Sequence, residues 1–194
     1  MSAELVVLVD DDGNAIGTAP KAEVHHESTP LHLAFSCYVF DADGRTLLSQ
    51  RALHKATWPG VWSNGFCGHP GPGEDLANAV RRRAEQELGL TLGSLELPLP
   101  AFRYEATMSN GVRENELCPV YVAAAASDAV ADPAEVADLK WVDWPVFRDA
   151  VLAGHGDASP WCAQQVAALA TVEEAPGRFT TASPSHLPPT ARPS

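Results

Sequence analysis

Three short stretches of the sequence carry side chains that could bind a metal ion or move a proton. They are HHESTPLH at residues 25–32, CGHP at residues 67–70 and ENE at residues 114–116. The two carboxylates of ENE are two positions apart, so a strand would point both toward one face. Imidazoles and carboxylates together could fill an octahedral site for a divalent ion such as Mn²⁺, Mg²⁺ or Zn²⁺. Spacing alone leaves the alternative open that these histidines are solvated surface residues.

Cys67 allows four interpretations: a disulfide, a metal ligand, a nucleophile or no chemistry at all. The four cysteines are far apart and form no C-x-x-C pair, unlike a secreted disulfide framework or a structural zinc site. This usage is typical of a protein from the reducing cytoplasm. A cysteine-protease pair would need a free imidazole nearby, but His69 belongs to the metal pattern. A thiol, with a reference pKa of about 8.5, could instead carry a proton.

The charge of the chain restricts its partners. The net charge of -12 and the sequence pI near 4.8 argue against nucleic acid and against an anionic membrane. Several cations nevertheless lie in the first 113 residues. They could form a local basic pocket for a small anionic ligand, or they could simply be a solvated helix face. The apolar run LVVLV is five residues long and has no preceding basic region, so it predicts a strand and neither a signal peptide nor a membrane span.

The periodicity of the sequence predicts an α+β fold. Hairpins are expected at residues 4–20 and, around an Asn-Gly turn, at residues 102–126. Residues 31–40 predict a strand in which His32, Ala34, Ser36 and Tyr38 share one face.

The later segments predict one strong helix, a loop and a strand followed by a second helix. Apolar residues at four-residue spacing indicate a helix over 74–88, closed by Gly89. Residues 54–73 are rich in Gly and Pro and predict an irregular loop, and residues 139–154 predict a strand followed by a helix.

Composition divides the chain into a domain and a tail. A length of 194 residues fits one domain, which we expect at residues 1–170. Residues 171–194 are rich in Pro, Ser, Thr and Ala, a composition that buries little apolar surface, so we expect a disordered tail.

The spacing G-x5-E-x7-R-x4-E-x-G begins at Gly68 and continues through Glu74, Arg82, Glu87 and Gly89. It resembles the Nudix box, a loop-helix-loop that binds metal diphosphates. Where the box of a Nudix hydrolase has REUxEE, this chain has RRAEQE, so two of the three magnesium-binding glutamates are missing. The resemblance therefore implies a Nudix-like mixed β-sheet sandwich with flanking helices, and it makes hydrolysis by the usual route doubtful.

Together with this degenerate box, the stretches WPGVWSNGFCGHP and YEATMSNGVRENELCPV resemble the type 1 isopentenyl diphosphate isomerases. The resemblance covers residues 4–170 and includes GTAPKAEVH, LHLAFS and QRALHK. It implies a 1,3-proton shift that interconverts isopentenyl and dimethylallyl diphosphate. Two other functions stay as alternatives: a Nudix pyrophosphohydrolase with a reduced box, and a silent module that only binds a diphosphate.

The resemblance also implies roles for individual residues. It implies catalytic roles for Cys67, Glu116 and Tyr104, and we assign Glu116 as the proton donor and Cys67 as the base. The residues that it places around the substrate are Lys21, Arg51, Lys55, Arg83 and Trp161. The ligands that it implies for Mn²⁺, Mg²⁺ or Zn²⁺ are His25, His32, His69, Glu114 and Glu116. It further implies a diphosphate-linked Mg²⁺ on Glu87 and the Cys67 carbonyl, and no flavin.

Overall fold

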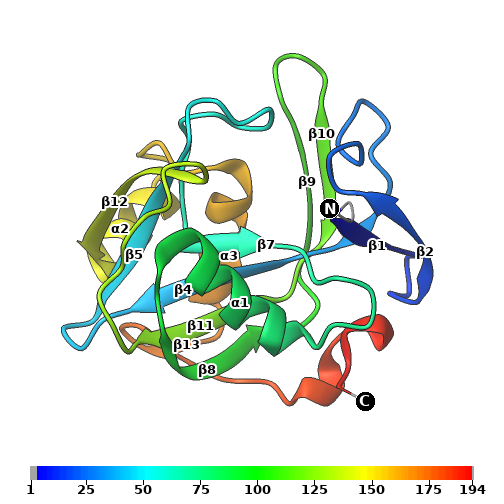
Figure 1. Cartoon of the computed structure of the whole chain (residues 1–194). Coiled ribbons are helices and arrows are strands. Elements are labelled where there is room, and N and C mark those ends of the chain that lie inside the picture. Colours follow the sequence, from blue (N-terminus) through cyan, green and yellow to red (C-terminus); the bar gives the residue numbers. More distant parts are fainter. Residues whose placement is uncertain (1–3, 194) are drawn as a thin grey trace.

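Two mixed β-sheets with helices on both sides form the body of the molecule (Figure 1). The structure is a computed structural model, and it describes residues 4–193. The smaller sheet has the strand order β2-β1-β3-β10-β9. Its strands are β1 (Leu5–Val9), β2 (Ala15–Pro20), β3 (His32–Leu33), β9 (Arg103–Thr107) and β10 (Arg113–Leu117).

The larger sheet has the order β12-β5-β4-β11-β8, with β6 paired to β5 and β7 paired to β4. Its strands are β4 (Phe35–Phe40), β5 (Arg45–Arg51), β6 (Trp62–Ser63), β7 (Phe66–Gly68), β8 (Leu92–Leu99), β11 (Val120–Ala125) and β12 (Val136–Asp143). The pairs β3–β10 and β4–β11 are parallel, and the other pairs in both sheets are antiparallel. The predicted mixed sheets are therefore confirmed.

The predicted strand over residues 31–40 is divided between the two sheets. The division falls at Ala34, whose amide donates to the carbonyl of Leu117 at 2.9 Å. The paired segment that contains β10 and β11 changes sheets next to Ala34, because Pro119 lacks the amide hydrogen that would continue β10. Two segments far apart in sequence thus run parallel through both sheets, and they carry His32 and Glu116 with them.

Three α-helices cover the larger sheet, namely α1 (Leu76–Leu88), α2 (Trp144–Leu152) and α3 (Pro160–Ala170). The predicted helix at 74–88 is confirmed as α1: the Asp75 side chain caps its start, and Gly89 ends it with a φ of 54°. The predicted helix near Pro145 is confirmed as α2. None of the helices among residues 4–193 has the length and apolarity to cross a membrane.

The central strand β4 buries both of its faces. Phe35, Cys37 and Val39 pack with α1 in one core cluster. Tyr38 and Phe40 pack with α2 and α3 in the other cluster. Side chains on the second face of β4 therefore meet α3 without contact with water.

The segment after residue 170 differs from the predicted disordered tail. In the structure it forms β13 (Glu173–Ala175), β14 (Arg178–Phe179) and the 3-10 helices η1 (Pro184–His186) and η2 (Pro189–Ala191). The segment runs along the edge of the molecule below β8 (Figure 1). Few apolar residues suffice to hold it, because Phe179, Leu187 and Ala191 are all buried in the two core clusters.

We expect Phe179→Ala to lower the free energy of unfolding by about 3–5 kcal/mol, because it empties the space between Phe40 and Trp144. Denaturant unfolding followed by circular dichroism measures the change. Val146→Ala is the control, because Val146 is 69% exposed and should shift stability by less than about 0.5 kcal/mol. Equal stability of wild type and Phe179→Ala would mean that the segment does not pack in solution.

Candidate active site

Strand register places Glu116 of β10 between two polar neighbours. Across the parallel pair it lies opposite His32 of β3, and across the antiparallel pair it lies opposite Tyr104 of β9. Glu116 is 5% exposed and His32 is fully buried. The carboxylate therefore has little water around it and depends on these side chains for its polar contacts.

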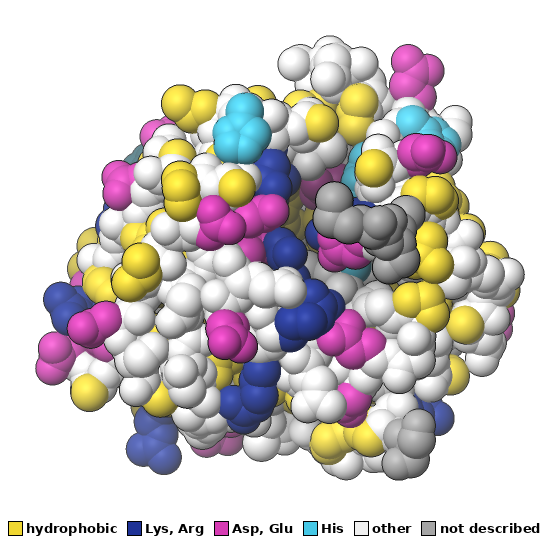
Figure 2. Space-filling view, in the orientation of Figure 1, with side chains coloured by type: hydrophobic (Ala, Val, Ile, Leu, Met, Phe, Trp, Pro, Cys, Tyr) yellow, Lys and Arg dark blue, Asp and Glu magenta, His cyan; other side chains and the backbone are white. Residues whose placement is uncertain are grey.

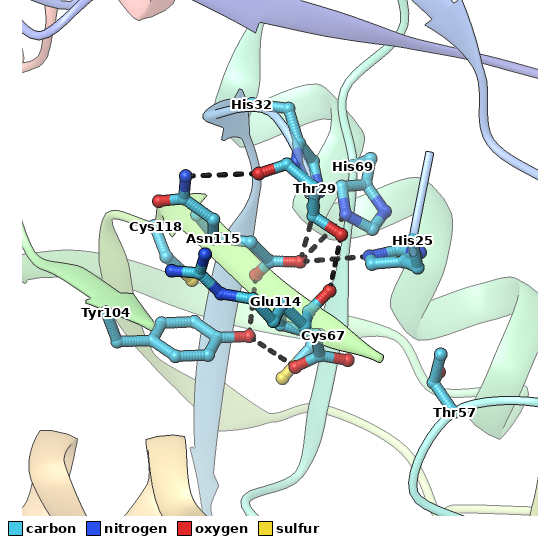
Figure 3. Close-up of polar contacts among 12 residues, drawn as sticks. His25, Thr29, His32, Thr57, Cys67, His69, Tyr104, Glu114, Asn115 and Cys118 are labelled. Carbon is cyan, nitrogen blue, oxygen red and sulfur yellow. Dashed lines mark hydrogen bonds and ion pairs between the residues drawn. The ribbon is translucent and has the colours of Figure 1, made fainter. Parts of the chain in front are cut away.

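Three imidazoles converge on one oxygen of this carboxylate (Figure 3). The distances from Glu116 Oε1 are 3.0 Å to His69 Nε2, 3.4 Å to His32 Nε2 and 3.9 Å to His25 Nε2. The four groups each offer one ligand atom, and these atoms lie within 4.8 Å of one another. The three histidines and Glu116 will be called the His/Glu cluster.

The protonation of His32 shows what the cluster can hold. His32 Nδ1 lies 2.9 Å from the carbonyl oxygen of Pro30, which can only accept, so Nδ1 carries the hydrogen. In the neutral ring, Nε2 then has a lone pair that faces the carboxylate of Glu116. With this neutral ring, two acceptors face each other, and a positive charge, either a proton or a cation, is needed between them. His25 Nε2 is also buried without a hydrogen-bond partner among the described residues. This donor set fits a divalent cation.

The pKa shifts follow from burial and from these contacts. Burial lowers the pKa of His69 to about 4, so its ring is neutral at pH 7. Burial by itself raises the pKa of Glu116, but the nearby ring nitrogens of the three histidines outweigh it and hold that pKa well below its usual range. Burial also lowers the pKa of His32, but the contact with Glu116 outweighs burial and raises that pKa, so Glu116 favours a proton on this ring. Metal binding releases such a proton, because histidine ligates a metal in its neutral form.

Glu114 lies beside the His/Glu cluster but outside the group of four. The predicted projection of both carboxylates of ENE to one face is confirmed, because the Tyr104 hydroxyl lies 2.9 Å from Glu114 Oε2 and 2.8 Å from Glu116 Oε2. Burial, followed by the nearby charge of Glu116, raises the pKa of Glu114 to about 7. Tyr104 thus links the two carboxylates.

A threonine that the sequence did not single out fixes the loop that carries His25. Thr29 Oγ1 lies 2.6 Å from the carbonyl oxygen of Arg113 and 2.7 Å from that of His26. The amide of Arg113 donates to the same His26 carbonyl at 3.1 Å, and the Asn115 side chain donates to the Thr29 carbonyl at 3.3 Å. These bonds tie the loop to β10. Thr29 precedes a proline in HHESTPLH, a position that predicts a turn but not this contact.

Cys67 faces the same pocket from β7. Its sulfur lies 3.2 Å from Ser36 Oγ and 3.5 Å from Asn64 Oδ1. Removal from water raises the pKa of the Cys67 thiol to about 12, so the thiol is neutral at pH 7. The other three cysteines are buried, and all four are free. Cys37 lies on the opposite face of β4, in the core cluster, as its position in the strand predicts.

A pocket of about 490 Å³ joins these groups. Its lining contains the residues predicted to bind substrate and all the predicted catalytic residues. The predicted metal ligands also line it except His32, which lies behind the surface. Acidic and basic side chains lie side by side on this face of the molecule (Figure 2).

The cations of the pocket are held by neighbouring groups. Lys21 pairs with Glu4 at 2.9 Å, and Lys55 pairs with Glu135 at 2.5 Å. Arg51 donates from Nε and Nη2 to the Thr57 carbonyl at 3.1 and 3.0 Å. Residue patterns did not reveal these partners. Glu4 and Glu135 lie far from their lysines in the sequence, and Thr57 accepts through a backbone atom.

Helix α1 points one side of the degenerate Nudix box into the pocket. Arg83 and Glu87 are both 8% exposed and form an ion pair, whereas Glu85 and Gln86 are exposed. Burial raises the pKa of Glu87, more than the charge of Arg83 lowers it. Gly68 permits this approach, because a Cβ there would lie 2.8 Å from both Arg83 Cγ and Phe35 Cζ.

Trp161 of α3 lines the same pocket. The indole is 3% exposed, and its ring centroid lies 6.1 Å from Tyr104 and 5.7 Å from Trp58. Its Nε1 has no hydrogen-bond partner among the described residues. The ring therefore both packs in the core and offers the pocket an apolar surface.

The chain is similar to known proteins over most of its length. Residues 30–162 match the NUDIX domain family. A protein from Saccharopolyspora erythraea called Isopentenyl-diphosphate Delta-isomerase is 53% identical over 188 residues, 97% of each chain. A protein of the same name from Clavibacter sepedonicus is 59% identical over 166 residues, 86% of this chain and 87% of its own.

Solved structures share the fold at low sequence identity. A Deinococcus radiodurans protein superposes with a TM-score of 0.64 at 18% identity, covering 84% of this chain and 98% of its own. A MutT protein from Methanosarcina mazei gives a TM-score of 0.55 at 18% identity, covering 71% and 91%. The Nudix-like α+β fold expected from the sequence is confirmed. The chain therefore belongs to the isopentenyl-diphosphate Delta-isomerases, within the NUDIX domain family.

Proposed function

We propose that the protein interconverts isopentenyl diphosphate and dimethylallyl diphosphate by a 1,3-proton shift. One observation carries the proposal: a thiol and a carboxylate cluster face the same pocket, which also contains paired cations and an indole. An unactivated alkene is a weak base, so its isomerisation requires a well-placed acid, a base and stabilisation of a tertiary cation. The family of the chain supports this reaction.

The diphosphate is assigned to the side of the pocket that carries Arg51, Lys55, Lys21 and Arg83. Diphosphate oxygens are stronger acceptors than the Thr57 carbonyl that now accepts from Arg51, and they would compete with Glu135 for Lys55. We assign a diphosphate-linked Mg²⁺ to the Glu87 carboxylate and the Cys67 carbonyl. Held at this end, the substrate extends its alkene toward Trp161 and Cys67.

The His/Glu cluster would hold Mn²⁺, Mg²⁺ or Zn²⁺, with Glu114 as a further ligand in our proposal. A divalent cation there supplies positive charge that lowers the pKa of the carboxyl groups and strengthens Glu116 as an acid. Tyr104 orients Glu116 through its hydroxyl at 2.8 Å.

Glu116 gives a proton to the terminal alkene carbon, and Cys67 removes a proton from C2. The cation formed between these steps lies against the π-face of Trp161, which also excludes water. The neutral thiol and ionised Glu116 of the structure correspond, under this assignment, to the enzyme after such a turnover. Cys67 must therefore return its proton to Glu116 before the next turnover. In the reverse reaction the two residues exchange their roles as acid and base.

The partner and the compartment follow from the same features. The ligand is a small isoprenoid diphosphate, and the net charge of -12 disfavours nucleic acid. Four free cysteines fit the reducing cytoplasm, where we place the protein.

We expect the purified protein to contain about one tightly bound divalent ion per chain. Mass spectrometry of the metal content after gel filtration measures it. His25→Ala should lose the ion, because it removes a ligand that has no other described polar partner. The control His155→Ala changes an exposed histidine and should keep the ion. A metal-free protein with full activity after chelation would exclude the metal site.

We expect Cys67→Ala to lower kcat by about a hundred- to ten-thousand-fold, because no neighbouring side chain can replace its proton transfer. Proton NMR of isopentenyl diphosphate in D₂O with Mg²⁺ follows the reaction, and wild type should place deuterium in the new methyl group. Cys37→Ala, in the core of the same sheet, is the control and should keep most activity. Near wild-type turnover by Cys67→Ala would falsify the assignment of Cys67.

We expect Arg51→Ala or Lys55→Ala to raise KM by about ten- to a hundred-fold, and the double variant to be more severe, because each change removes a charged hydrogen bond to the diphosphate. Steady-state kinetics gives KM and kcat separately. Arg45→Ala removes an exposed arginine from the same strand and should leave KM unchanged. Wild-type kinetics in the double variant would place the diphosphate elsewhere.

A further inference from the structure

A buried chain of neutral polar side chains lies behind Cys67. It begins at Ser36, which lies opposite Cys67 in the antiparallel pair of β4 and β7. Partners at this position point to the same face, and Ser36 Oγ accordingly lies 3.2 Å from Cys67 Sγ. Ser36 is fully buried, so it contacts the thiol from the side away from the pocket.

Gln165 of α3 sets the direction of the Ser36 hydroxyl. Its Nε2 donates to Ser36 Oγ at 2.8 Å, and its Oε1 accepts from the Tyr38 hydroxyl at 3.2 Å. Ser36 is thus an acceptor toward Gln165, and its single hydrogen is available for a sulfur. The two sulfurs in reach are Cys67 Sγ at 3.2 Å and Cys118 Sγ at 3.4 Å.

Asn64 provides an acceptor on another side of the same thiol. Its Nδ2 donates to the carbonyls of Cys37 and Phe66 at 3.1 and 2.9 Å, which fixes the orientation of the amide. Its Oδ1 therefore faces Cys67 at 3.5 Å and also accepts from Ser63 Oγ at 2.8 Å. The sulfur of Cys67 lies between a donor and an acceptor, both of which are held by further hydrogen bonds.

Burial of polar side chains in a core costs free energy, so their presence behind Cys67 points to a role other than packing. Ser36, Asn64 and Gln165 are all fully buried, and the face of α3 around Gln165 is otherwise apolar. Gln165 lies one helical turn after Trp161, so one helix holds both the indole of the pocket and the group that orients Ser36.

We infer that Ser36 and Gln165 are positioning residues for the Cys67 thiol: Gln165 orients the Ser36 hydroxyl, which holds the sulfur toward the substrate. This inference rests on the proposed isomerase function. Proton transfer to or from carbon depends steeply on geometry, so a freely rotating thiol would lower the rate of the chemical step. Substrate binding, which depends on the cations and the metals, would be unaffected.

The test compares Ser36→Ala, Gln165→Leu and the double variant by kcat, KM and inhibition by inorganic diphosphate. We expect each single variant to lower kcat by about ten- to a hundred-fold. KM and the inhibition constant should stay within about twofold of wild type. If Gln165 acts through Ser36, the double variant should lose no more than Ser36→Ala alone.

Thr46→Val is the matched control, because it removes a buried hydroxyl that bonds the Val39 carbonyl at 3.2 Å, away from Cys67. It should show a similar loss of thermal stability with unchanged kcat. Ser36→Ala removes only one oxygen, so it decides the matter even where Gln165→Leu does not fold. Wild-type kcat in Ser36→Ala, or a kcat loss shared by Thr46→Val, would overturn the inference. An inactive wild type would instead reject the isomerase function.

Discussion

The structure depends on a buried carboxylate that faces three imidazole nitrogens. Glu116 and Nε2 of a neutral His32 are both acceptors, 3.4 Å apart, and burial makes such an arrangement unfavourable without positive charge between them. The strands nevertheless hold them there, because β3 and β9 pair with β10 on either side of Glu116. Strand pairing thereby brings the ligand atoms together, and the free energy of cation binding would offset the desolvation of these ligands.

The second charged region of the pocket is balanced by the protein itself. Lys21 and Lys55 each pair with a carboxylate, and Arg83 pairs with Glu87. The two lysine pairs are partly exposed and contribute little to stability, so a diphosphate can displace their acids at small cost. The acids in turn reduce the repulsion among cations when no substrate is bound. A chain of net charge -12 can thus keep a local site for an anion.

Periodicity predicted the features that depend on local structure. Alternation in ENE correctly placed two carboxylates on one face, and four-residue spacing before Gly89 correctly predicted α1. The change of sheet at Ala34 was missed, because it depends on pairing with a segment more than 80 residues away. The order of residues 171–193 was also missed, because three buried side chains outweigh a polar composition. The roles of Thr29 and Gln165 are invisible in sequence, since each depends on a contact across the fold.

The site differs from the Nudix box of a hydrolase in the side chains that α1 points into the pocket. A helix turns about 100° per residue, so Arg83 and Glu87 share one side while Glu85 points to solvent. With Arg83 and Gln86 at two of the glutamate positions of the box, the helix offers the pocket a single carboxylate, Glu87, and Arg83 already pairs with it. The larger set of potential ligands is the His/Glu cluster, in which His32 and Glu116 lie on the smaller sheet. In our proposal, the charge that would activate water next to a diphosphate would instead lie beside Tyr104 and the alkene of the substrate, where protonation of carbon requires it.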